Sequence, residues 1–467
     1  MKRRASALCA AVVGGLLLAP AAAQAHGLVG RIDLPIPRYL FAWAAAIVLV
    51  VSFVGLATLW PRPRLEGEPA RRRLVAVPPV VDWLAGALGV GLFGLVVYSG
   101  LAGTKTATAN LAPTFVYVIF WVGLAFLSGI FGDVFRALNP WRAVARLIAW
   151  VASRVASKGL PEPLPYPQWL GRWPAVAGIL GFAWLELVYT NRTDPTLLAL
   201  LGLGYAAIQL VGMSLYGIEP WSSRGDAFSV YFGMFARLSP FERRDGVLYL
   251  RPPLSGTTSL DRVPGTVALL CVMIGTTSFD GFSQGSLWSQ VAPDVQHFFV
   301  TLGANLETAL ELAFTVGLIG AVAFISGIYR LGVLGMRSVA EGPAPRELAG
   351  RFVHSLIPIA LAYVVAHYFS LLVYQGQVAP DLLGNPLGHG LNAGGSIDYN
   401  VISATGIWYV QVAALVIGHV CGLVVAHDRA LISYPTARLA TRSQYWMLAV
   451  MIGFTSLGLW ILSSTNT

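Results

Sequence analysis

The chain has 467 residues, of which 56% are apolar and only 11% charged, and its mean hydropathy is +0.67. Soluble proteins are about 25% charged, so this composition excludes an ordinary water-soluble protein. The net charge of +9 does not predict a nucleic-acid partner, because the basic residues flank long apolar runs, where they orient membrane helices and meet anionic lipid.

The first 25 residues are typical of a secretory signal peptide. A basic start at residues 2–4 precedes an apolar core at residues 8–18 and the small-residue cleavage motif Ala23-Gln24-Ala25. We therefore expect residues 1–25 to be removed and the mature chain to begin at His26, outside the cytoplasmic membrane. The alternative is an uncleaved first helix, against which the cleavage motif and the short core argue.

Ten apolar runs follow along the rest of the chain. Most are close to the ~20 residues that a helix needs to cross the hydrocarbon core. No change of composition marks a separate soluble domain, so we predict an all-α polytopic membrane helical bundle of about ten transmembrane helices, formed by residues 26–467 as one domain in the lipid bilayer. The runs are residues 38–60, 80–102, 114–131, 173–190, 196–217, 264–282, 298–328, 352–375, 404–426 and 444–463.

The basic residues lie almost entirely on one side of this arrangement. Of the 31 Lys and Arg residues, 24 fall in the five loops that share a side, three lie in the first four residues, and only Arg31, Arg38, Lys105 and Arg192 lie opposite. The positive-inside rule makes the crowded side cytoplasmic. We therefore expect the mature amino terminus and the carboxyl terminus outside the cytoplasmic membrane.

Two features of the cytoplasmic loops stand out. Residues 139–157 have helical periodicity with Arg142, Arg146 and Arg154 on one face, which predicts a basic amphipathic helix on the membrane surface. Gly-Asp-x-Phe occurs at residues 132–135 and again at residues 225–228, each followed by a proline motif. Duplication and chance explain this echo equally well.

Ionisable residues within the apolar runs gather at one depth. A charge in hydrocarbon costs several kcal/mol and usually marks function or a buried pair. The predicted topology places all of the following in the outer half of the bundle or in its outer loops, and together they form the candidate site: Glu186, Asp280, His297, Glu307, Glu311, His367, His389 and Asp398.

Glu307 and Glu311 are four residues apart and share one helix face. Two carboxylates this close repel unless a cation or a shared proton lies between them. We therefore expect a divalent transition metal, Zn, Mn or Fe, held by Glu307, Glu311, His367 and His297. The alternative is that these groups only join helices by polar contacts, since no spaced ligand motif is present.

A free amino-terminal histidine presents its amine and ring nitrogen together, which suits copper. His26 is therefore a further candidate metal ligand. It would need a second imidazole, for which His297 and His389 are the available outer candidates.

Residues 281–285 read Gly-Phe-Ser-Gln-Gly, a G-x-S-x-G string. In soluble esterases this string exposes a nucleophilic serine at a strand-to-helix turn. Ser283, near Asp280 and with a histidine base at the outer face, is thus a candidate catalytic residue. The alternative is an ordinary turn that ends a transmembrane helix.

Five short motifs along the chain can be compared with known families: His26-Gly27-Leu28-Val29-Gly30-Arg31, Asp33-Leu34-Pro35-Ile36-Pro37, Phe41-Ala42-Trp43-Ala44, Asn139-Pro140-Trp141-Arg142 and Ser278-Phe279-Asp280-Gly281-Phe282-Ser283. Together they resemble a family of actinobacterial membrane proteins that carry the name fenitrothion hydrolase. The similarity extends over most of the chain. It implies hydrolysis of an organophosphate ester, a phosphotriester with an aryl leaving group, and supplies no catalytic residues.

Three hypotheses of function follow. In the first, an apolar ester reaches the site from the bilayer, a metal polarises the phosphoryl oxygen, and Glu307 or Glu311 acts as the base. In the second, the same cavity binds an ion or proton in a transporter or metal-handling permease. In the third, the protein is a non-catalytic partner subunit of another membrane protein.

Overall fold

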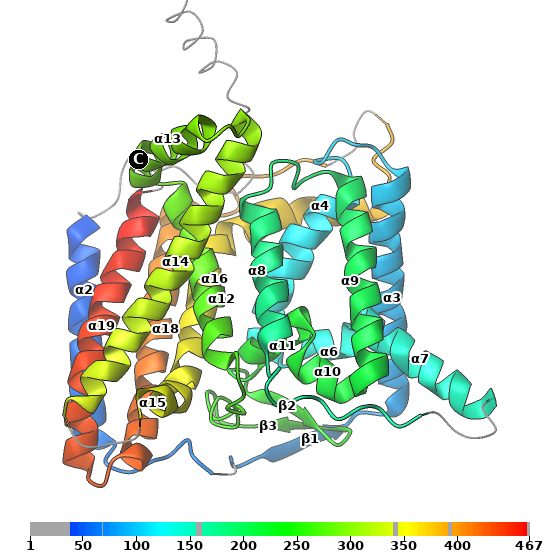
Figure 1. The fold of residues 1–467 in the computed structure, drawn as a ribbon. Helices are drawn as coiled ribbons and strands as arrows, with labels where there is room; N and C mark the ends of the chain where they lie inside the picture. Colours follow the sequence, from blue (N-terminus) through cyan, green and yellow to red (C-terminus); the bar gives the residue numbers. More distant parts are fainter. Residues whose placement is uncertain (1–37, 68, 156–160, 340–343, 391–394, 465–467) are drawn as a thin grey trace, which may run out of the picture.

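The computed structural model describes residues 38–67, 69–155, 161–339, 344–390 and 395–464. Within them, nine helical segments are long and apolar enough to cross a membrane, which confirms the predicted all-α polytopic bundle (Figure 1). Residues 1–25 and His26 lie outside the described residues. The nine segments are α2 (Arg38–Leu59), α3 (Pro79–Ala102), the continuous α4 (Leu111–Thr114), η2 (Phe115–Gly123) and α5 (Leu124–Phe131), α9 (Pro195–Tyr216), α12 (Thr266–Ser283), α14 (Leu306–Arg337), α16 (Leu356–Gln375), α18 (Ala404–Ser433) and α19 (Ala437–Ser464). 

The fourth predicted run forms a shorter helix, α8 (Trp173–Leu187), of 15 residues. At 1.5 Å per residue such a helix is roughly 22 Å long, which is less than the ~30 Å of the hydrocarbon core. Arg172 and Arg192 flank it at its two ends. One side of the helix packs against α11 (Ala227–Ala236) and α12.

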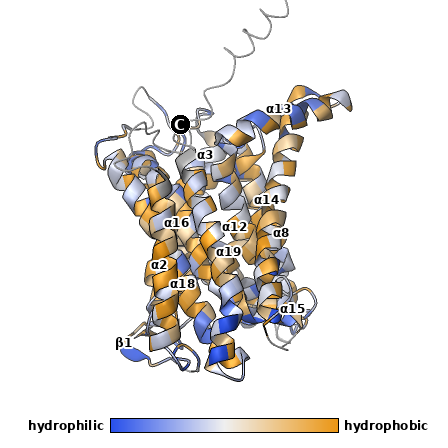
Figure 2. Cartoon of the chain, turned by 90° about the vertical axis from the view of Figure 1, so that its left-hand side faces the viewer, coloured by the Kyte–Doolittle hydropathy of each residue, from blue (hydrophilic) through white to orange (hydrophobic). Residues whose placement is uncertain are grey.

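The two ends of the bundle differ. One end, here called the sheet end, carries the three strands β1 (Arg72–Ala76), β2 (Phe241–Arg244) and β3 (Val247–Leu250), with α6 (Val134–Leu138), α7 (Pro140–Val155), α10 (Ile218–Arg224) and α15 (Pro345–Phe352). The other, the α13 end, carries α13 (Ser286–Thr301), with η4 (Gly376–Val378) and α17 (Ala379–Gly384) following α16. A short η3 (Val353–Ser355) joins α15 to α16. Hydrophilic residues concentrate at the sheet end and hydrophobic ones along the helices between the ends (Figure 2).

The sheet was not predicted from the sequence. Its strands run in the order β1-β3-β2, and both pairs are antiparallel. Asp245 and Gly246 join β2 to β3 with φ angles of 49° and 73°, as a two-residue hairpin turn requires. Strands of four or five residues are too short to stand out beside membrane-length runs, although the Asp-Gly pair is a recognisable turn signal.

The predicted run at residues 298–328 is divided in the structure, so its expected start as a single span is wrong. Its first residues belong to α13, which lies across the end of the bundle (Figure 1). The chain then turns at Gly303, whose φ is +99°, and Asn305 caps α14 by accepting a 2.8 Å hydrogen bond from the Thr308 amide. His297 therefore lies on α13 and not at the mouth of a span.

The predicted amphipathic segment is confirmed as helix α7, with Ile148, Trp150 and Val155 exposed. The Gly-Asp-x-Phe echo also has a structural counterpart, because Asp133 caps α6 and Asp226 caps α11. Asp226 is fully buried. It accepts hydrogen bonds from Asn139, Trp141, Tyr205 and Ser229. Asp226, from the second Gly-Asp-x-Phe motif, thus holds Asn139 and Trp141, which belong to the proline motif that follows the first Gly-Asp-x-Phe motif.

Candidate functional site

The most deeply buried acid–base contact lies between α12 and α16. His367 Nε2 is 2.9 Å from Asp280 Oδ2, and the Tyr368 hydroxyl donates a 2.8 Å hydrogen bond to the same oxygen. Asp280 is 0% exposed and His367 is 6% exposed. Asp280 lies one turn before α12 ends at Ser283, so the pair is inside the membrane-crossing part of the bundle.

The sequence of α12 explains how these groups meet. Nearly every side chain of this helix is buried, because α8, α14 and α16 all pack against it. A glycine permits the close approach of α14, because a Cβ on Gly275 would lie 2.7 Å from the Val322 backbone. A Cβ on Gly281 would lie 3.0 Å from Ile461 Cγ2 and, in ordinary van der Waals contact, 3.5 Å from His367 Nδ1. Asp280 is the acidic residue of this close-packed helix, whose other buried polar side chains are threonine and serine hydroxyls.

His367 also lines a small cavity. The space open to the centre of a water molecule is about 20 Å³, and roughly 10–15 Å³ by this measure holds one water. The cavity is large enough for a water molecule, which could carry a proton, and is too small for an aryl ester. Its other lining residues are Thr277, Ser278, Gly281, Tyr363, Ala366, Leu415, Gly458 and Ile461.

A second buried histidine, His419, lies next to Tyr363, one of the residues that line this cavity. The ring of His419 is centred 6.1 Å from that of Tyr363, which lines the cavity. Its Nδ1 lies 2.8 Å from the Leu415 carbonyl oxygen, so this nitrogen carries the hydrogen and Nε2 is left as an acceptor. His419 is 0% exposed.

Glu186 adds a second carboxyl group near the pair. It lies on α8, is buried, and is close enough to Asp280 for their charges to interact. Asp280 therefore lies near a second carboxyl group, that of Glu186, as well as the imidazole of His367. The prediction that Glu186, Asp280 and His367 lie at one depth agrees with these contacts; the direct contact of Asp280 with His367 and Tyr368 was not foreseen.

Glu307 and Glu311 form a separate group around Thr190. The Thr190 hydroxyl is 2.6 Å from Glu307 Oε1 and 2.9 Å from Glu311 Oε1, and its amide donates to Glu311 at 3.1 Å. The two glutamates therefore lie on the same face of α14, as predicted, and a single threonine of the chain segment after α8 contacts both of them.

The remaining predicted site residues lie apart from these groups. His297 and His389 are exposed at the α13 end, where Asp398 is also exposed. Ser283 donates a 2.9 Å hydrogen bond to the Asp280 main-chain oxygen, as expected at the end of a helix. Across the described parts of the chain, no group of three or more His, Cys, Asp or Glu side chains could hold a metal ion. The predicted ligands Glu307, Glu311, His297 and His367 are not brought together as one set.

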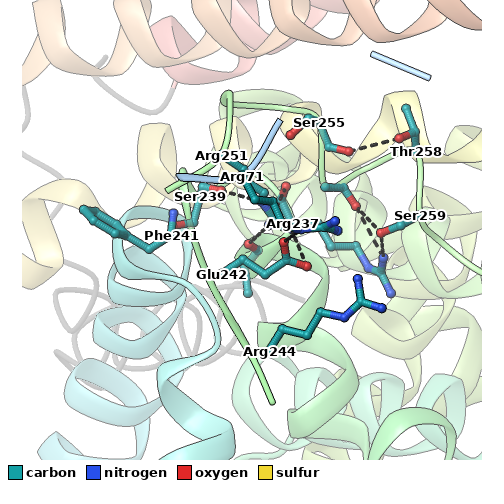
Figure 3. A network of polar contacts seen from close by, with 12 residues as sticks. Arg71, Arg237, Ser239, Phe241, Glu242, Arg244, Arg251, Ser255, Thr258 and Ser259 are labelled. Atoms are coloured by element: carbon teal, nitrogen blue, oxygen red, sulfur yellow. Dashed lines mark hydrogen bonds and ion pairs between the residues drawn. The ribbon is translucent and has the colours of Figure 1, made fainter. Parts of the chain in front are cut away.

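A further polar network fixes the sheet end (Figure 3). Glu242 lies 2.7 Å from Arg71 Nε and 3.3 Å from Arg251 Nη1, and Arg251 also donates to the main-chain oxygens of Ala236 and Ser239. Burial would raise the pKa of Glu242, but the hydrogen bond from Arg71 and the charge of Arg251 outweigh it and lower that pKa below its ordinary value. The network ties β1 and β2 to the loop that follows α11.

No protein-family model, curated protein or solved structure matches the chain.

Proposed function

We propose that this protein is a proton-coupled membrane transporter and that Asp280 and His367 form its proton-binding site. The observation that carries the proposal is the 2.9 Å contact between the two groups in the buried interior of the bundle. Ionisable residues at such depth are rare and mark ion or proton pathways. The water-sized cavity beside His367 supports an occluded state that holds no large substrate.

The pair offers a way to couple protonation to structure. With one shared proton the pair is neutral overall, and after losing that proton it carries one uncompensated negative charge in a medium where such a charge is costly. The deprotonated pair therefore favours a conformation in which water reaches it. Since Asp280 belongs to α12 and His367 to α16, the change acts directly between these two helices.

Proteoliposomes loaded with a pH-sensitive dye test this proposal. A panel of small ions and metabolites is added under an imposed membrane potential, and proton entry is followed. We expect at least one solute to drive proton flux in the wild type and none to do so in Asp280→Asn. His297→Gln, which changes an exposed histidine of α13, is the matched control and keeps the flux. Equal flux in Asp280→Asn and the wild type would contradict the proposal.

A second candidate is hydrolysis of apolar organophosphate-type esters. It is supported by the resemblance to the fenitrothion hydrolase family and by the Asp–His pair next to a water-sized cavity, because an imidazole oriented by a carboxylate can act as a general base on water. In a second form of this candidate, a divalent metal at Glu307 and Glu311, which lie apart from the Asp–His pair, would polarise the ester there with one of these glutamates as the base. Release of the aryl alcohol by the wild type, and its loss in Asp280→Asn or in Glu307→Ala/Glu311→Ala, would favour this candidate and identify its site. Elemental analysis of the same proteins tests the metal.

A further inference from the structure

Three arginines surround one carboxylate at the sheet end, where α8 and α12 begin and α10 ends. Arg172 Nη2 is 4.0 Å and Arg224 Nη2 is 3.8 Å from Asp261 Oδ2. Arg237 is also close enough to interact with the charge of Asp261, and its guanidinium donates to Ser259 at 3.0 Å (Figure 3). Both Asp261 distances exceed a direct hydrogen bond, so the pairing of Asp261 with Arg172 and Arg224 is incomplete. Arg237 also interacts with the charges of Asp133 and Glu242.

Arg172 is the best-defined member of this group. Its residue is only 2% exposed, and Nη1 donates to the Asp261 main-chain oxygen at 2.9 Å and to Thr266 Oγ1 at 2.6 Å. Its Nε is buried and has no hydrogen-bond partner within the described residues. Nε and Nη2 form one edge of the planar guanidinium, and this edge matches two oxygens of a phosphate or carboxylate.

Burial and the neighbouring charges make this edge costly to leave empty. Burial, together with the charge of Arg237, lowers the pKa of Arg172 to about 10. A buried donor without a hydrogen-bond partner destabilises the folded protein, and a charged donor does so more strongly. An additional anion would offset both effects. Asp261 has a side chain that is 52% exposed, so it leaves the group open to water on that side.

The surface beside the arginines is apolar and aromatic. Leu164, Trp169 and Trp173 are 57%, 75% and 49% exposed. Arg224 lies over the ring of Tyr166, at 5.7 Å from its centroid. Exposed tryptophans next to arginines at the end of a membrane helix are typical of the headgroup layer.

We propose that Arg172, Arg224 and Arg237 bind a phosphate group, carried by an anionic lipid headgroup or by a soluble phosphate compound. The phosphate would take the place of the exposed Asp261 carboxylate, so that its oxygens reach Nη2 and Nε of Arg172. Arg224 and Arg237 would supply the remaining positive charge. The exposed tryptophans favour the lipid, whose glycerol and acyl chains would lie against them. This site is independent of the proton-binding pair and of the proposed transport.

Four proteins, delipidated in detergent, test the proposal: the wild type, Arg224→Gln, Asp261→Asn and the control Arg337→Gln/Arg346→Gln. The control removes two exposed arginines at the same end of the bundle. Each protein is titrated with phosphatidylglycerol, with phosphatidylcholine, and with inorganic phosphate, and binding is followed by native mass spectrometry and by the thermal unfolding midpoint. Arg172→Lys, which keeps the charge but loses the two-donor edge, is measured beside them.

We expect affinity to fall about tenfold in Arg224→Gln and in Arg172→Lys, as loss of one charge-assisted contact implies. Affinity should rise in Asp261→Asn, because a competing carboxylate is removed, and stay unchanged in the control. A variant that merely unfolds cannot produce this increase. Binding of phosphatidylglycerol alone identifies the lipid, and equal binding of inorganic phosphate identifies a soluble source. The same affinity in all the proteins, or weaker binding by Asp261→Asn, would overturn the proposal.

Discussion

A carboxylate inside a membrane bundle persists only with partners, and the partners of Asp280 include a tyrosine and a histidine that contact it in different ways. Tyr368 donates a hydrogen bond to it, whereas His367 lies at ion-pair distance. Removing one partner of a buried pair leaves the other uncompensated, which is usually worse than removing both. The contribution of this contact is therefore best measured as a coupling between the two residues.

We expect Asp280→Asn and His367→Gln to be non-additive. Each single change should lower the thermal unfolding midpoint in detergent, and the double variant should be less destabilised than the sum, by a coupling of about 0.5–3 kcal/mol. The pair Asp280→Asn and His297→Gln is the control, because His297 lies on exposed α13. If the destabilisations caused by Asp280→Asn and His367→Gln were additive in the double variant, the contact between the two residues would contribute no coupling energy.

The contribution of Glu242 to the stability of the fold should decrease as the pH falls. Its pKa lies below the ordinary 4.5, so its stabilising contribution is fully present above about pH 4.5 and is lost as the pH falls through the lowered folded value. At neutral pH, Glu242→Gln should cost about 1–3 kcal/mol, since Arg251 loses a charged partner while staying buried.

Unfolding midpoints of Glu242→Gln and the wild type, measured between pH 7 and pH 3, check this expectation. The difference between them should shrink toward the acid end. Glu162→Gln, which changes an exposed acid, should match the wild type throughout. A difference that grows as the pH falls would contradict the assigned direction.

At the scale of elements, apolar length and loop charge predicted the helices, because each span must satisfy its own backbone within the bilayer. Apolar length alone wrongly predicted that the end of α13 and the start of α14 form one span. Phe298 and Leu302 continue the apolar run, and only Gly303 and Asn305 mark the break between the two helices. In the site, depth was predictable from position along each span. The partners of Asp280 were not, because they depend on how α12 and α16 are rotated about their axes, which periodicity alone leaves open.

The glycines of α12 and α14 should differ in their tolerance of a side chain. Gly275→Ala places a Cβ 2.7 Å from the Val322 backbone, which forces the two helices apart at a cost of about 1–3 kcal/mol. Gly320→Ala is the matched control, because an added Cβ there meets nothing within 4 Å. We expect a lower unfolding midpoint for the first variant only. An equal effect of the two variants would show that helix propensity, and not packing, sets the response.

At the scale of the whole molecule, the asymmetry of charge between the two ends assigns an orientation. The three strands, the helices α6, α7, α10 and α15, and almost all arginines of the described residues lie at the sheet end, whereas the α13 end has only Lys105 and Arg192 among its described loops. By the positive-inside rule, the sheet end is expected to face the cytoplasm. Asp280 and His367, which we propose as the proton-binding pair, would then load from the outside, and the proposed phosphate site would face the cytoplasmic leaflet.

Single cysteines at the two ends test this orientation in intact cells. Ser286 and Ser338 are exposed at the α13 end and the sheet end, and Cys271 is buried, so a background with Cys421→Ala leaves the introduced thiol as the accessible one among the described residues. A membrane-impermeant maleimide should label Ser286→Cys without lysis and Ser338→Cys only after permeabilisation. The reverse pattern would place the sheet end outside. The arginines that we assign to a lipid phosphate would then face the outer leaflet, and protons would reach Asp280 from the cytoplasm.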